Sequence, residues 1–341
     1  MQHRLHIGET ASSSRKEVSR EASGSDTFSR MDTGSSAAAA ITRAETPGRA
    51  ARYGRAMQTI GVLGLGRMGA PIAARLAAAG YTVTGFDPRG SAGGTLSRAG
   101  SALELAASVD VLITVLPGRA ESEAVMPDLL AAMTPGALWL DLSSGDPALT
   151  ELLARGVRAV GAPMGGGPAE AQAGTLTLFV GGAAADVDSL RPLLETIASR
   201  IERAGERPQD GQIVKLLANL LWFGQAVAVT EALLLGVSLG LSLAAMREIL
   251  PRSAGGSAFM DGYLDLLLAG DYAETFGLDR CVEELDTLAA LAATAGTPFA
   301  LSNLVAGLHR EALAVFGPVD GELLVAKLLE QRAGIDLSAS S

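Results

Sequence analysis

Cysteine, histidine and aromatic residues are scarce in this chain. One of its 341 residues is a cysteine, three are histidines, and aromatic residues make up 4%. The single cysteine, Cys281, excludes an intrachain disulfide and a metal centre built from several thiolates. His3 and His6 stand near the N-terminus and only His309 lies further along, so we predict no metal site.

Positive charge is also in short supply. Lysine and arginine number 27 against 37 aspartates and glutamates, which gives a net charge of −10 and a pI near 4.9. Nucleic acids and anionic membranes bind basic protein faces. We therefore expect a small-molecule substrate and neither of those partners.

One apolar run is long enough to be compared with a membrane span. Residues 216–241 are interrupted by Asn219, Gln225, Thr230 and Glu231, and no basic flank follows them. A span would need about 20 predominantly apolar residues. We predict instead a helix of a water-soluble domain that is buried on all sides.

The first 56 residues differ from the rest of the chain. They are rich in Ser, Ala, Gly, Arg and Glu and show no sustained hydrophobic period, which is typical of disorder. They lack the apolar core of a secretory signal, and their acidic residues count against a transit peptide. We predict a disordered extension over residues 1–56, a natural start at Met57 and a cytoplasmic protein.

Apolar patterns divide the remaining chain into two parts. Strands are expected at 59–64, 82–87, 111–116, 138–142, 157–162 and 176–181, with helices such as 68–79, 121–133 and 186–197 between them. Beyond about residue 208 the patterns are helical, at 212–239, 243–250, 277–295 and 298–316. Alternating strands and helices predict a parallel sheet. The chain is therefore expected to be α/β first and all-α second.

A glycine-rich loop follows the first expected strand and opens the first helix. Its residues are Gly64, Leu65, Gly66, Arg67, Met68 and Gly69. The first glycine permits a tight turn, the second lets a pyrophosphate approach, and the third allows close packing of helix on strand. The helix N-terminus offers N–H groups to phosphate. This context predicts a dinucleotide site; a glycine-rich turn without a ligand is the alternative.

Asp87 and Arg89 bear on which dinucleotide binds. Asp87 ends the second strand about 20 residues after the loop, where an acidic side chain hydrogen-bonds the adenosine ribose. A carboxylate repels the 2′-phosphate of NADP, which favours NAD. Arg89 could bind that phosphate or be a solvated loop charge. We expect NAD, with NADP not excluded.

Three further loops follow expected strands. Ligands of open α/β sheets bind beyond the carboxyl ends of the strands, so we expect Leu116, Pro117 and Ser144 to contact the cofactor. Helix capping explains a serine there equally well. The consecutive glycines at 165–167 expose backbone N–H groups that suit a substrate acid group, although a flexible turn is equally compatible with them.

Lys215 stands in the long apolar segment, four residues before Asn219, which places both on one helical face. A buried ammonium is unfavourable unless it is paired or has a task. A lysine whose stem is buried and whose head reaches water is the alternative. Together with the upstream glycine loop, Lys215 predicts hydride transfer with a lysine that handles the proton.

Several segments, taken in order, resemble signatures of the β-hydroxyacid dehydrogenase family. This family includes 3-hydroxyisobutyrate dehydrogenase and tartronate semialdehyde (2-hydroxy-3-oxopropionate) reductase. The similar segments are 64–69, 162–167, 174–177 with 180–182, and 211–219. The resemblance spans about residues 58–330.

The resemblance implies both a fold and an activity. It implies a Rossmann domain with a doubly wound, mostly parallel sheet in residues 57–207. A long interdomain helix then leads into an all-helical domain in residues 208–335 that mediates assembly into a homodimer or homotetramer. It also implies NAD(P)-dependent hydride transfer on a β-hydroxy acid or its semialdehyde, with Lys215 as the catalytic residue. In that family Asn219 would orient the substrate, with Gly165, Gly166 and Gly167 around its acid group.

The chain departs from the family pattern at three places. Gly165 stands where a serine is usual, Gly161 where an aspartate is usual, and Glu283-Glu284 where a Lys-Asp pair lies near cofactor and substrate. Glu283 is therefore an expected cofactor contact. Arg280, one helical turn earlier, could restore the lost positive charge or form a surface ion pair. We interpret these departures as an altered substrate.

Two other functions fit parts of the pattern. Imine reductases share the resemblance and reduce C=N bonds with NADPH, and a non-catalytic nucleotide-binding module would need only the glycine loop. Both classes usually lack the lysine at position 215. The presence of Lys215 therefore favours the dehydrogenase.

Overall fold

The computed structural model describes residues 59–90 and 96–339. The disordered extension predicted for residues 1–56 and the start predicted at Met57 lie outside the described residues. All elements below belong to the part of the chain after Pro47.

The N-terminal half forms a mixed sheet of nine strands. Their order is β3-β2-β1-β4-β5-β6-β8-β7, with β9 paired to β8. The pairs from β3 to β6 are parallel, β8 runs antiparallel to β6 and β7, and β9 is parallel to β8. The strands are β1 Thr59–Leu63, β2 Thr82–Phe86, β3 Ser97–Arg98, β4 Val111–Thr114, β5 Leu138–Asp141, β6 Arg158–Gly161, β7 Met164–Gly165, β8 Leu176–Gly182 and β9 Ala198–Gly205. The predicted mostly parallel sheet is confirmed.

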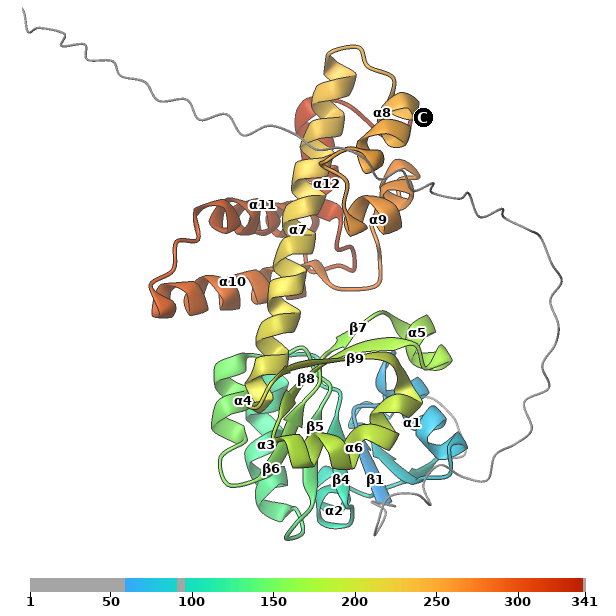
Figure 1. The fold of residues 1–341 in the computed structure, drawn as a ribbon, viewed down its shortest axis with the longest axis vertical. Helices are drawn as coiled ribbons and strands as arrows, with labels where there is room; N and C mark the ends of the chain where they lie inside the picture. Colours follow the sequence, from blue (N-terminus) through green and yellow to red (C-terminus); the bar gives the residue numbers. More distant parts are fainter. Residues whose placement is uncertain (1–58, 91–95, 340–341) are drawn as a thin grey trace, which may run out of the picture. The chain divides into compact units, whose positions relative to one another are not determined.

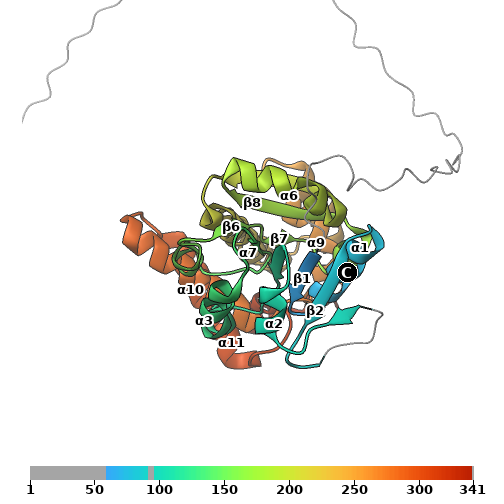
Figure 2. The ribbon, with the colours of Figure 1, turned by 90° about the horizontal axis from the view of Figure 1, so that it is seen from below.

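Helices cover both faces of this sheet (Figure 2). One face packs on α1 (Gly69–Ala78), α5 (Pro168–Ala173) and α6 (Ala184–Ile197), and the other on α2, α3 and α4. The latter three span Ala102–Ala107, Arg119–Ala132 and Pro147–Leu153. Because alternate strand side chains point to opposite faces, each face has its own apolar core. The doubly wound arrangement is likewise confirmed.

Strand β9 lies where no strand is predicted. It pairs with β8 alone, and five of its eight residues are polar or charged or lack a side chain, with Arg200 and Glu202 exposed. Charged side chains on an edge strand protect it from pairing with other chains. They also interrupt the apolar pattern from which a strand is predicted. Two short helices, α9 (Ala258–Leu268) and α12 (Leu324–Ala333), are similarly absent from the predicted set.

The C-terminal half is helical. A 31-residue helix, α7 (Pro208–Ser238), extends from the sheet into it (Figure 1). The others are α8 Leu243–Ile249, a 3₁₀ turn at Leu250–Arg252, α9 Ala258–Leu268, α10 Leu278–Ala295, α11 Ala300–Phe316 and α12 Leu324–Ala333. Their apolar faces share one core with the C-terminal two thirds of α7. The predicted long helix and helical C-terminal half are confirmed.

The prediction that this apolar helix is buried on all sides is wrong. Leu217, Leu221 and Leu235 of α7 are 46%, 66% and 61% exposed. By length and composition α7 could also cross a membrane, and it is the one described helix that could. Its buried residues, among them Phe223 and Leu233, pack against the other helices. Because the helix is apolar all round, its sequence does not indicate which side chains the described residues leave exposed.

Close backbone contacts fix the start of α7 on the sheet. A Cβ atom on Gly211 would lie 2.3 Å from the carbonyl oxygen of Phe179, and one on Gly161 would lie 2.3 Å from that of Pro208. Side chains do not fit at such distances. This contact leaves no room for a side chain at position 161, where the family pattern has an aspartate.

Candidate active site

The glycine loop has the geometry that a bound pyrophosphate requires. Gly64 has φ +92°, and a Cβ atom on it would lie 2.2 Å from the carbonyl oxygen of Val115. A Cβ on Gly69 would lie 1.9 Å from the carbonyl oxygen of Gly64, whereas a Cβ on Gly66 would meet nothing within 4 Å. The outer two glycines are thus needed for folding, and the middle one leaves open space above the N-terminus of α1. NAD(P) fits this loop.

Asp87 closes the loop from the end of β2. Its Oδ2 accepts a hydrogen bond from Leu65 N at 2.9 Å and its Oδ1 accepts one from Arg89 N at 2.9 Å. The Asp87 side chain is 3% exposed, whereas the Arg89 side chain, whose Nε lies 3.7 Å from Asp87 Oδ1, is 74% exposed. Asp87 is therefore hydrogen-bonded to the loop and enclosed, whereas the Arg89 side chain extends into solvent.

The other side chains of the loop point in different directions. Leu65 and Met68 pack into the apolar core under α1. The Arg67 guanidinium forms an ion pair of 3.1 Å with Asp320, in the segment between α11 and α12. The contribution of Leu65 and Met68 to a cofactor site is therefore through the backbone.

A cleft of about 350 Å³, including space open to solvent, joins the sheet to the helices. It is lined by Pro117, Ser144, Gly145, Asp146, Leu216, Phe276, Arg280, Glu283, Glu284 and Thr287. Three predicted cofactor residues, Pro117, Ser144 and Glu283, thus meet in one place. Leu116 does not line the cleft; its backbone N–H donates to Ser143 Oγ at 2.9 Å.

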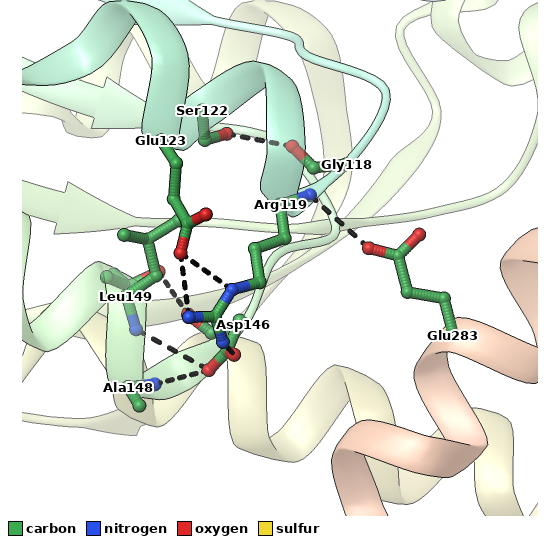
Figure 3. Close-up of polar contacts among 9 residues, drawn as sticks. Gly118, Arg119, Ser122, Glu123, Asp146, Ala148, Leu149 and Glu283 are labelled. Carbon is green, nitrogen blue, oxygen red and sulfur yellow. Dashed lines mark hydrogen bonds and ion pairs between the residues drawn. The ribbon is translucent and has the colours of Figure 1, made fainter.

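Glu283 holds α10 against α3, as Figure 3 shows. Its carboxylate accepts from Arg119 N at 3.4 Å and pairs with Arg280 at 2.7 Å. The Arg119 side chain turns away to Glu123 and Asp146. Arg280 thus lies beside Glu283, which stands where the family has its lysine, and close to the start of α3, since a Cβ on Gly118 would lie 2.5 Å from Arg280 Nη1.

Lys215 begins a chain of hydrogen bonds that crosses from α7 to α10. Its Nζ donates to Asn219 Oδ1 at 2.9 Å, and Asn219 Nδ2 donates to Glu284 Oε2 at 2.6 Å. Glu284 is 7% exposed, and burial raises the pKa of its carboxyl against the opposing effects of Lys215 and Asn219. Lys215 itself is half-buried. The predicted pairing of Lys215 with Asn219 on one helical face is present.

Gln212 anchors the helix that carries Lys215, and sequence patterns did not single it out. It is fully buried; its Nε2 donates to Ser143 O at 2.9 Å and to Asp141 Oδ2 at 3.2 Å, and its Oε1 accepts from Gly145 N at 2.9 Å. Burial raises the pKa of Asp141, whose hydrogen bonds oppose the shift. The only sequence signal was an amide in an apolar helix, one turn before Lys215.

The substrate loop differs from the prediction in one respect. Gly167 N donates to Glu170 Oε2 at 2.8 Å, so a carboxylate of the chain already occupies one of the three expected N–H donors. Gly166 forms the turn, with φ +103°. Gly165 has room for a side chain, because a Cβ there would lie 3.6 Å from both Phe179 and Thr177.

Comparison with known proteins agrees with this geometry. Residues 59–205 match the model of the NAD binding domain of 6-phosphogluconate dehydrogenase. Residues 210–329 match the model described as NAD-binding of NADP-dependent 3-hydroxyisobutyrate dehydrogenase. A 2-(hydroxymethyl)glutarate dehydrogenase of Eubacterium barkeri is 31% identical over 293 residues, which cover 82% of this chain and 97% of that protein. The chain belongs to the β-hydroxyacid dehydrogenase family.

Other members of the β-hydroxyacid dehydrogenase family are similar to comparable degrees. An NAD-dependent L-serine dehydrogenase of Pseudomonas aeruginosa is 37% identical, over 61% of this chain and 74% of that protein. The structure of a Mycobacterium tuberculosis 3-hydroxyisobutyrate dehydrogenase with L-serine has a TM-score of 0.72 at 28% identity, covering 80% of this chain and 99% of that one. Family membership makes this chain an NAD(P)-dependent oxidoreductase.

Imine reductases are more distant. The enzyme of Streptomyces aurantiacus has a TM-score of 0.51 at 23% identity, covering 80% of this chain and 99% of that one. Similarity at this level shows a shared fold alone. It gives the C=N alternative no support beyond the architecture.

Proposed function

We propose that this chain catalyses reversible hydride transfer between NAD(P) and the alcohol carbon of a β-hydroxy acid or its semialdehyde. The observation that carries the proposal is the 2.9 Å hydrogen bond from Lys215 Nζ to Asn219 Oδ1, on the helix that borders the cleft. The substrates named for two relatives, 2-(hydroxymethyl)glutarate and L-serine, are both β-hydroxy acids, which supports this class.

Lys215 is the proton-handling group of the proposal. In oxidation its amine accepts the hydroxyl proton, and in reduction its ammonium polarises the carbonyl and returns the proton. Asn219 holds the substrate oxygen next to Lys215, and Gln212 fixes the helix that carries both. Such acid–base catalysis contributes on the order of 10²–10⁴-fold to the rate.

The cofactor site of the proposal lies at the carboxyl ends of the parallel strands. When bound, NAD(P) supplies the hydride acceptor for oxidation and the donor for reduction. Its pyrophosphate would rest above Gly66 and its adenosine ribose near Asp87, while Pro117 and Ser144 would contact its nicotinamide half. The buried carboxylate of Asp87 supports NAD over NADP, because it would repel a 2′-phosphate.

A screen with both cofactors tests the proposal. The purified chain is assayed at 340 nm with NAD⁺ or NADP⁺ against β-hydroxy acids, and with NADH or NADPH against semialdehydes and cyclic imines. We expect turnover of a hydroxyl or semialdehyde compound, faster with NAD(H). Turnover of imines alone would establish the C=N alternative, and cofactor binding without any turnover would establish a non-catalytic module.

We also propose that the protein is a cytoplasmic homodimer or homotetramer assembled through its helical half. Large apolar side chains there are exposed, including Leu235, Leu239 and Leu241 at 61%, 72% and 58%. Exposed apolar surface of this kind marks contact sites between proteins. Sedimentation of a monomer at micromolar concentration would contradict the assembly, and recovery of the protein in a membrane fraction would contradict the location.

A further inference from the structure

Glu284 is linked to the proton-handling lysine through Asn219. Asn219 uses only one oxygen of Glu284, and the other, Oε1, is buried without a hydrogen-bond partner among the described residues. Glu284 lines the cleft and is 7% exposed. A buried carboxylate oxygen that accepts no hydrogen bond lowers the stability of the protein. A hydrogen-bond donor of a ligand would satisfy Oε1.

A second carboxylate, which is half-buried, lies within reach of the charge of the same lysine. Glu322, which precedes α12, accepts a hydrogen bond from Thr275 Oγ1 at 3.2 Å. Burial raises the pKa of Glu322 while the Thr275 hydrogen bond and the charge of Lys215 lower it, and the charge of Glu284 raises it. The described residues thus place two carboxylates, Glu284 and Glu322, near a single lysine.

Groups that would bind a substrate carboxylate are missing or engaged. Gly165 offers no hydroxyl, and Gly167 N already donates to Glu170. Arg280, the one described cation among the cleft residues besides the neighbouring Lys215, is paired with Glu283 at 2.7 Å. The balance of charge and donors therefore favours a substrate that carries a positively charged group.

We propose that the substrate carries a protonated amine next to its reacting hydroxyl and that Glu284 Oε1 accepts a hydrogen bond from this ammonium. The ammonium would supply the missing donor, and it would keep a positive charge beside the carboxylates while Lys215 is the neutral amine that accepts the hydroxyl proton. A charge-assisted hydrogen bond in a buried site is strong, and a compound without the amine would leave the carboxylate unpaired. This inference rests on the proposed function, since it concerns the substrate of the same reaction.

Four small alcohols separate the contributions of the two charges. Serine has both an ammonium and a carboxylate, 2-amino-1,3-propanediol only the ammonium, 3-hydroxypropanoate only the carboxylate, and 1,3-propanediol neither. All four present the same hydroxymethyl group. We measure kcat/KM of the full chain for each with NAD⁺ and with NADP⁺, and we test both enantiomers of serine. We expect kcat/KM to be at least tenfold higher for serine than for 3-hydroxypropanoate, and at least tenfold higher for 2-amino-1,3-propanediol than for 1,3-propanediol.

Glu284→Gln tests the assigned residue. Glutamine keeps an oxygen for Asn219 but loses the charge, so the ammonium advantage should fall below threefold, whatever common factor the substitution imposes on all four compounds. Glu248→Gln, on the exposed side of α8, is the matched control and should retain the advantage. Because the advantage is a ratio, partial loss of folded protein does not affect it.

The outcomes distinguish this inference from the proposed function. Turnover with a carboxylate preference and no ammonium preference would overturn the inference and leave the dehydrogenase intact. An ammonium advantage that survives Glu284→Gln would overturn the role of Glu284. Absence of turnover with all compounds and both cofactors, here and in the screen of β-hydroxy acids, would overturn both.

Discussion

His309 is a titratable side chain enclosed in the helical core. It is fully buried, its Nδ1 lies 2.9 Å from the carbonyl oxygen of Val305, and its Nε2 has no partner among the described residues. Burial lowers the pKa of His309 from 6.5 to about 4, against a smaller opposing effect of the Val305 hydrogen bond. The folded protein therefore holds a neutral imidazole, which protonates more readily once the chain unfolds.

This arrangement predicts a loss of stability in acid. A lowered folded-state pKa gives stability that is present above pH 6.5 and is lost as the pH falls toward 4. The loss is up to about 3 kcal/mol in free energy of unfolding. In His309→Phe, which keeps an aromatic ring beside Phe223, this part of the acid dependence should vanish. Urea titrations of both proteins from pH 7 to pH 4 measure it, and parallel curves would contradict the assignment.

Residue types alone were enough to predict some of the site and not the rest. Lys215 and Asn219 were found because a helix brings positions four apart together. Gln212 and Glu322 were missed, since their importance depends on loops and helices distant in sequence. The engagement of Gly167 by Glu170 was equally hidden, because a capping contact competes with a ligand for the same N–H.

At the level of elements, the start of α7 depends on glycine. The backbone of the helix lies against the backbone of β6 and β8. A Cβ atom on Gly211 would lie 2.3 Å from the carbonyl oxygen of Phe179. A Cβ atom on Gly224, further along the same helix, would meet nothing within 4 Å. A side chain therefore does not fit at Gly211, whereas there is space for one at Gly224.

Alanine substitutions should separate these two positions. Gly211→Ala forces the helix away from the sheet and should lower the free energy of unfolding by at least about 2 kcal/mol, with a fall in turnover because Lys215 moves too. Gly224→Ala should be neutral or stabilise the protein by up to about 1 kcal/mol, because alanine favours the helix. Thermal melts compare the two, and equal shifts would show that the close contact has no energetic role.

Elements with continuous apolar patterns were predictable, and elements defined by their partners were not. The inner strands β4 and β5 are buried along their whole length, β1 is buried except at Thr59, and all three lie within the predicted ranges. Strand β9 is polar because only one side of it is paired, and the exposed face of α7 is apolar although helices cover only part of it. Both depend on tertiary neighbours that local sequence does not encode.

At the level of the whole molecule, the two halves contribute different parts of the site. In the proposed function, the strand ends supply Gly66, Asp87 and Pro117 for the cofactor, and the helices supply Lys215 and Glu284 for the substrate. Contacts such as Arg67 with Asp320 and Arg119 with Glu283 link these halves. Catalysis and cofactor binding should therefore be separable by mutation.

The central claim is that Lys215 handles the proton of the reaction. The decisive measurement is kcat of Lys215→Met with the best substrate of the screen, alongside the Kd for NADH by fluorescence. We predict that kcat falls at least about 100-fold while the Kd changes less than about threefold, because Lys215 lies on α7 and the cofactor loop follows β1. A kcat within about fivefold of the unmodified protein would contradict the account.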